Sequence, residues 1–115
     1  MYDSVGYLRV RSFTAGGAIP IEGAVIRLHG ADEENYELFR SVITDRDGVG
    51  FFKELPTPNV SFSLSPRPQE SPYALYDLEI TAEGYDPQII KGVQVFPGIE
   101  SYQPINLIPK TSIQQ

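Results

Sequence analysis

The sequence has no cysteine and no tryptophan, and its 115 residues include a single histidine and a single methionine. Without cysteine the chain cannot form a disulfide, a thiolate zinc site or a cysteine nucleophile. One histidine, His29, is too few for a zinc site built from several histidines. Basic residues are also scarce, with 9 Lys and Arg against 15 Asp and Glu. They form no stripe that could face a row of phosphates, so nucleic acid is an unfavourable partner.

Long hydrophobic runs are missing as well. The uncharged apolar stretches span only a few residues, whereas a membrane-spanning helix needs about 20. The first residues, Met1–Val5, contain neither a basic nor an apolar signal segment. We therefore expect no membrane span and no signal peptide in this chain.

Glycine and proline, in contrast, are abundant, with 10 of each. Short β-branched and aromatic runs lie between Gly, Pro and Asp clusters, and no segment shows sustained helical periodicity. This pattern predicts an all-β fold, an antiparallel β-sandwich of seven strands with little or no helix. The length allows one domain, which we place at residues 1–109, with a polar tail or linker start at residues 110–115.

Alternation within the runs predicts which side chains face the core. In residues 76–81, apolar residues alternate with Asp77 and Glu79, which indicates a central strand with one wet face. The residues expected to point inward include Leu8, Val10, Ala24, Ile26, Leu28, Leu78 and Ile80. Other expected extended segments are residues 36–44, 51–55 (ended by Pro56), 60–64 and 103–109, with an irregular connection at 65–71.

The segment Asp45-Arg46-Asp47-Gly48 resembles the start of a calcium-binding loop, because carboxylates at alternate positions can converge on one ion. An EF-hand loop also needs a bidentate glutamate at its twelfth position, and here that position is Pro56. In the alternative, a tight turn, Asp side chains cap backbone amides and Gly48 adopts a positive φ. We therefore predict a metal-free turn in which Asp45, Asp47 and Gly48 have structural roles.

Candidate catalytic residues are sparse. Asp77 and Glu79 share one face, but no nucleophile stands beside them in the sequence. His29 has no acid or nucleophile as an obvious sequence neighbour. We predict that the chain is not an enzyme and that it has no catalytic, cofactor-binding or metal-binding residues.

Two further segments receive structural predictions. The acidic residues 31–35 are expected to form a solvated hairpin loop. Tyr85, which follows Gly84, is expected to anchor a corner of the sandwich.

Tyrosines could also line a glycan groove, although tyrosine is equally an ordinary residue of a sandwich, with its hydroxyl in water. The seven are Tyr2, Tyr7, Tyr36, Tyr73, Tyr76, Tyr85 and Tyr102.

Several segments together resemble the carboxypeptidase regulatory-like domain, namely residues 20–26, 44–48, 55–56, 80–85 and 107–109. The resemblance covers nearly the whole chain and implies a prealbumin-like (transthyretin-like, Ig-like) β-sandwich. Pro72-Tyr73, Tyr76-Asp77 and residues 92–103 are also similar to the N-terminal pro-region of spore cortex-lytic enzymes. In that family the sandwich precedes peptidoglycan-binding and hydrolase segments, which residues 1–115 do not include.

This resemblance implies a non-catalytic accessory or structural module associated with the spore or cell envelope, with peptidoglycan as a possible partner. Two other functions stay open. One is a structural subunit that assembles into a fibre or surface layer through its edge strands, with itself or another protein as partner. The other is a carbohydrate-binding module that uses exposed tyrosines.

Overall fold

The computed structural model describes residues 2–59 and 72–111, and these are almost entirely β-structure. One three-residue 3-10 turn, η1 (Ala15–Gly17), is the single helical element in this part of the chain. The strands are β1 (Ser4–Thr14), β2 (Ile19–Pro20), β3 (Val25–Gly30), β4 (Phe39–Ile43), β5 (Val49–Thr57), β6 (Ala74–Thr81), β7 (Gln88–Val95) and β8 (Glu100–Asn106).

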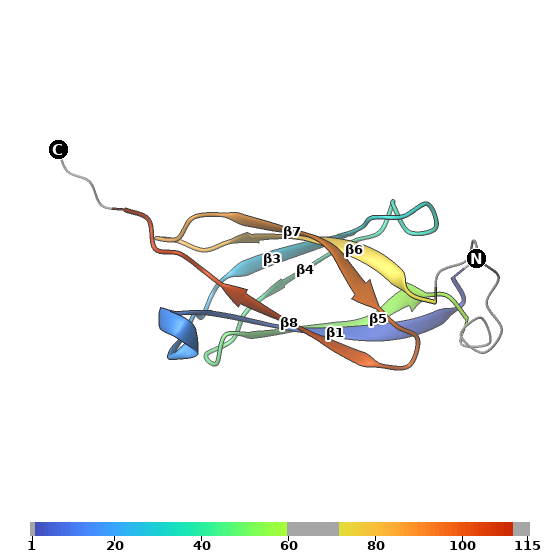
Figure 1. Cartoon of the computed structure of the whole chain (residues 1–115), viewed down its shortest axis with the longest axis horizontal. Helices are drawn as coiled ribbons and strands as arrows, with labels where there is room; N and C mark the ends of the chain where they lie inside the picture. The colour runs from blue at the N-terminus through green and yellow to red at the C-terminus, as the bar shows by residue number, and fades with distance from the viewer. Residues whose placement is uncertain (1, 60–71, 112–115) are drawn as a thin grey trace.

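The strands form two sheets that face each other (Figure 1). In one sheet, β1 pairs with β5, with β8 and, near its end, with the short β2; in the other, the order is β4-β3-β6-β7. The predicted all-β sandwich with little helix is therefore confirmed. The described strands number eight rather than seven, because Ile19–Pro20 pairs with β1 instead of only connecting two strands.

β8 departs from the predicted antiparallel arrangement because it runs parallel to β1, with Glu100 opposite Tyr7. The turn at residues 96–99 carries the chain from β7 in one sheet to β8 in the other, and Tyr7 N donates to Ile99 O (3.1 Å) where β8 begins. Parallel neighbours need a long connection between them, and the intervening strands supply it. β8 also lies earlier in the chain than the predicted segment 103–109.

β5 continues through Pro56, where the sequence predicted that the strand would end. Pro56 pairs with Val5 and lies on an edge strand, which tolerates proline because the missing N–H faces no neighbouring strand. Nearby, Glu54 adopts a φ of +53° and the register with β1 shifts, which marks a β-bulge. β4 is shorter than the predicted segment 36–44. The predictions for residues 60–64 and 65–71 lie outside the described residues.

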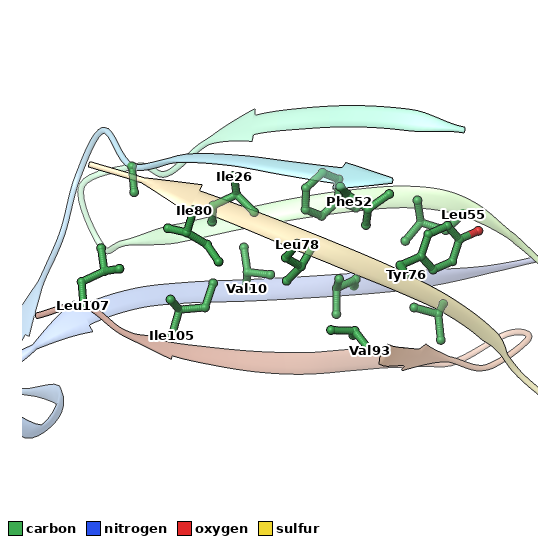
Figure 2. Close-up of a cluster of buried hydrophobic side chains, with 14 of the residues drawn as sticks. Val10, Ile26, Phe52, Leu55, Tyr76, Leu78, Ile80, Val93, Ile105 and Leu107 are labelled. Carbon is green, nitrogen blue, oxygen red and sulfur yellow. The ribbon is translucent and has the colours of Figure 1, made fainter. Parts of the chain in front are cut away.

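The core lies between the two sheets (Figure 2). All seven residues predicted to point inward have no exposed surface. Full burial of a valine, leucine or isoleucine side chain contributes roughly 1.5–3 kcal/mol. The polar groups at the margin of the core are paired, because the hydroxyls of Ser12 and Thr44 both donate to Ile21 O, at 2.9 and 2.8 Å. The remaining large buried side chains include Phe52, Leu55, Tyr76, Val95, Ile105 and Leu107.

Candidate functional site

Residues 45–48 form a tight turn between β4 and β5, and Asp45 organises it. Its Oδ1 accepts hydrogen bonds from Asp47 N and Val49 N, both at 2.9 Å. Gly48 N donates to Asp45 O (2.9 Å), and Gly48 has a φ of +79°. A side chain at Gly48 would also collide with Ser12 O. This carboxylate is therefore engaged with its own backbone, while Asp47 contributes a backbone N–H.

The corner at Gly84 and Tyr85 holds the C-terminal segment against the sandwich. Gly84 has a φ of +88°, and its carbonyl accepts a hydrogen bond from Lys110 N (2.9 Å). Tyr85 forms an isolated bridge with Pro109, and its partly buried side chain packs against the core. Asp86 N donates to Ile108 O (2.9 Å), two residues before Lys110. The ordered backbone contacts of the domain therefore reach Lys110.

Asp77 and Glu79 lie on the outer side of the sheet, as the alternation predicts. The register places His29 opposite Asp77 across β3 and β6, a proximity that the sequence distance conceals. The Asp77 carboxylate supports the backbone, since its Oδ1 accepts from Gly92 N (2.9 Å) at an irregularity in β7. These carboxylates therefore belong to an open sheet face.

The acidic segment 31–35 lies in a hairpin connection between the antiparallel strands β3 and β4, as predicted, but only part of it is exposed to solvent. Glu33 and Glu34 are exposed, but Asp32 is half-buried and Asn35 is buried. Tyr2 Oη donates to Asp32 Oδ2 (2.8 Å). Burial, followed by this hydrogen bond, raises the pKa of Tyr2 above its ordinary value. Asp32 and Asn35 thus act as a structural anchor, which a run of acidic letters does not reveal.

A band of aromatic and arginine side chains crosses the outer side of the other sheet. Alternation along β1 turns these side chains away from the core, and the register places Arg9 between Phe51 of β5 and Tyr102 of β8. The sequence does not reveal this band, because its members come from three strands. We call it the aromatic–arginine face, and it consists of Tyr7, Arg9, Arg11, Phe13, Phe51 and Tyr102.

The rings and guanidinium groups of the aromatic–arginine face contact one another. Tyr7 and Phe51 stack with their ring centroids 6.1 Å apart and an interplanar angle of 6°. Arg9 Cζ lies 4.9 Å from the centroid of Phe51, and Arg11 Cζ lies 5.2 Å from that of Phe13. At these distances each guanidinium group makes a cation–π contact with the ring. Tyr102 remains 54% exposed.

An ion pair borders the same face, with Arg9 Nε 2.6 Å from Glu100 Oε2. The hydrogen bond from Arg9 lowers the pKa of Glu100, and the same bond raises the pKa of Arg9. Both side chains are exposed, so the pair orients Arg9 more than it stabilises the fold. Within the described residues, no three His, Asp or Glu side chains are grouped to hold a metal ion. What this face offers is an exposed surface for contact.

No family model matches the chain, and no curated protein matches it. Solved structures share its fold. The Bacillus anthracis TIE protein matches over 93% of this chain and 17% of its own length, with 18% identity and a TM-score of 0.64. Catechol 1,2-dioxygenase from Pseudomonas arvilla C-1 matches over 97% of this chain and 55% of its own length, with 17% identity and a TM-score of 0.63. Hydroxyquinol 1,2-dioxygenase from Pseudomonas putida DLL-E4 matches over 96% of this chain and 58% of its own length, with 13% identity and a TM-score of 0.60.

These likenesses establish the fold alone. The chain spans less than two thirds of each of those proteins, and in the TIE protein the matched part is 17% of the chain. One small β-sandwich therefore occurs inside longer proteins that carry different names. Because unrelated functions share folds, the dioxygenase activity named for two of them does not follow for this chain.

Proposed function

We propose that the chain is a non-catalytic β-sandwich module of a spore or cell envelope and that it acts by contact. The aromatic–arginine face is the observation that supports this function. It presents stacked rings and oriented guanidinium groups on an open sheet surface. The occurrence of the same fold as part of longer chains is consistent with a module. No helix in the described residues is long and apolar enough to cross a membrane.

Peptidoglycan is the ligand class that we propose for this face. Sugar rings stack on aromatic rings, and the carboxylates of its lactyl and peptide groups suit arginine, which binds carboxylates through paired N–H donors. Tyr102 and Phe51 flank Arg9 in the register, so rings and charge lie within the reach of one glycan segment. The sequence resemblance to the pro-region of spore cortex-lytic enzymes points to the same ligand.

Co-sedimentation with purified peptidoglycan sacculi tests this function. We expect the wild-type chain to bind and Tyr102→Ala to bind about tenfold more weakly, the order of magnitude for a lost stacking contact. Tyr36→Ala is the matched control, because Tyr36 is 67% exposed but lies outside the aromatic–arginine face. Absence of binding by the wild type, or equal weakening by both variants, contradicts the proposal.

A release assay on the same sacculi tests the non-catalytic part. We expect no reducing ends and no free amines to appear above the background of sacculi alone. Asp77→Asn and Glu79→Gln remove the two paired carboxylates of the sheet face. Turnover by the wild type that either variant abolishes would show that this face is catalytic.

A further inference from the structure

The edge strands of the two sheets differ in how they are protected from pairing with another chain. β5 carries Pro56 and a bulge at Glu54, and β8 carries Pro104. β7 contains Gly92, with a φ of +74°, where its register with β6 shifts. Prolines and bulges at an edge prevent regular strand addition. β4 (Phe39–Ile43) contains neither device.

The backbone of β4 offers hydrogen-bonding groups on its free side. Thr44 N donates to Ala24 O (2.9 Å), and Gly30 N donates to Leu38 O (3.1 Å). Residues bonded to β3 therefore recur at positions 38, 40, 42 and 44, since bonding alternates along an antiparallel pair. The intervening positions 39, 41 and 43 turn their N–H and C=O groups away from β3.

The side chains of residues 39, 41 and 43, which lie on the outer face of the sheet, are unusually apolar for an edge strand. Phe39 is 60% exposed and Ile43 is 68% exposed, and both lie on the outer side of the sheet with Ser41 between them. The single charged residue of the strand, Arg40, is directed across the sandwich, where its Nη1 donates to Lys53 O (3.0 Å). Arg40 thus makes an exposed contact with β5 of its own chain.

We propose that the β4 edge binds the β4 edge of a second copy of this chain, in an antiparallel pair centred on Ser41. The two-fold axis places Ser41 opposite the partner's Ser41 and Phe39 opposite the partner's Ile43. Each outward N–H and C=O then meets a complementary group. The four-stranded sheet β4-β3-β6-β7 of one copy then continues into the same sheet of the second copy.

The self-complementarity of the strand supports a second copy as the occupant. A closed dimer uses the same patch on both chains, so position 39 must suit position 43 and position 40 must suit position 42. The first match joins an aromatic ring and a β-branched side chain, a favourable cross-strand pair. The second match places Arg40 opposite Val42 of the other copy, so that no two arginines face each other directly.

The scale of the contact predicts a weak dimer. The pair involves five residues from each copy, well below the area of a standard stable interface. Each copy carries a net charge of −6, which opposes association at low ionic strength. We therefore expect dimerisation at roughly 0.1–1 mM protein and tighter association as salt is added.

Sedimentation velocity of the full chain over a concentration series tests the proposal. The wild type is expected to show a reversible monomer–dimer equilibrium, and Ile43→Lys is expected to weaken it about tenfold or more, because it replaces two symmetric apolar pairs. Ile89→Lys is the matched control, since Ile89 is 63% exposed but lies on the protected strand β7. A wild type that stays monomeric at about 1 mM, or equal weakening by both variants, overturns the proposal.

Cross-linking tests the register independently. Because the chain has no cysteine, Ser41→Cys introduces a single thiol, and the pairing places its Cα about 5.5 Å from its counterpart, within disulfide range. Copper–phenanthroline oxidation is expected to link Ser41→Cys much faster than Thr81→Cys, a control at an exposed hydroxyl position of β6. Equal rates, or a fast reaction that survives Ile43→Lys, would overturn the Ser41-centred register. Neither assay contains a glycan, so its failure is separate from failure of peptidoglycan binding.

Discussion

The loop at residues 31–38 and the turn at residues 45–48 start from the same local chemistry. In each, the Oδ1 of a leading aspartate accepts a hydrogen bond from the amide two residues later. The distance is 3.0 Å from Glu34 N to Asp32 and 2.9 Å from Asp47 N to Asp45. Such Asx turns form wherever an aspartate caps its own backbone. The two segments therefore share the same local hydrogen bond.

The two aspartates differ in how far their remaining contacts reach. Asp45 Oδ1 accepts its second hydrogen bond from Val49 N (2.9 Å), four residues away in the chain. Asp32 uses Oδ2 to accept from Tyr2 Oη (2.8 Å) and from Leu75 N (3.0 Å), which lie in distant parts of the chain. A closed local turn shapes one corner, whereas the Asp32 carboxylate joins three segments. The difference lies in tertiary contacts, and stability measurements can expose it.

The largest expected effect is that of Asp32→Ala, which removes the acceptor for Tyr2 Oη and for the part-buried Leu75 N. Unmet buried donors cost roughly 1–3 kcal/mol each, so we expect the free energy of unfolding to fall by about 3 kcal/mol. Chemical denaturation followed by circular dichroism measures it. Glu33→Ala, at an exposed neighbour, is the control. A loss below about 1 kcal/mol would mean that the anchor is as local as the Asp45 turn.

The second-largest expected effect is a loss of stability at alkaline pH, through the ionisation of Tyr76. Burial raises the pKa of Tyr76 to about 12 from 10.0, and its hydroxyl donates to Pro56 O (2.6 Å). Below pH 10 the phenol keeps its proton in both states, so stability does not change. Between pH 10.0 and about pH 12, this tyrosine loses its proton in the unfolded chain but keeps it in the folded chain. The free energy of unfolding therefore falls over this window by about 2 kcal/mol, allowing for partial screening by solvent.

Denaturation at about pH 8 and about pH 11 is expected to show about half of this loss, roughly 1 kcal/mol, because pH 11 lies midway between the two pKa values. Tyr76→Phe lacks the titrating hydroxyl, so its stability is expected to depend less on pH over this window. The variant also gives up one hydrogen bond, worth about 0.5–1.5 kcal/mol at neutral pH. An identical pH dependence in wild type and variant would show that Tyr76 is not the titrating group.

Asp45→Ala should have a smaller effect, because the two amides it releases lie in an exposed turn and regain water. We expect a loss of about 1 kcal/mol, similar to removal of a helix cap. Asp47→Ala is the matched control, since its contribution to the turn is a backbone N–H, and we expect a change within about 0.5 kcal/mol. If Asp45→Ala costs as much as Asp32→Ala, the comparison between the two regions fails.

The faces of the strands could be predicted from the sequence, whereas their directions and their places in the sheets could not. Alternation identified the inward faces of β1, β3 and β6, because a strand with one wet side has a period of two. Alternation is insensitive to strand direction, so it could not show that β8 runs parallel to β1. It also could not predict that Pro56 lies within an edge strand, since edge position is a property of the assembled sheet.

The candidate sites were less predictable than the strands, for a related reason. The Asp45 turn depends on neighbours within five residues, and its pattern is visible in the sequence. The aromatic–arginine face and the Asp32 anchor bring together residues 30 or more positions apart. Asn35 illustrates the limit, because it follows three acidic residues and is nevertheless buried, with its Nδ2 donating to Leu75 O (3.1 Å). Tertiary contacts, not composition, created those sites.

Calcium should leave both regions unchanged, and this is the smallest expected effect. At the turn, two amides already occupy Asp45 Oδ1, and the position that would supply a bidentate glutamate is Pro56, a residue of β5 that pairs with Val5 of β1. At the loop, Tyr2, Leu75 and Glu34 N occupy the Asp32 carboxylate. We expect calorimetric titration to show no binding in the micromolar range and thermal unfolding to be the same in calcium and in EDTA. A stoichiometric isotherm that Asp45→Asn abolishes would instead show that the ion displaces backbone donors from the turn, and the turn would then be a binding loop.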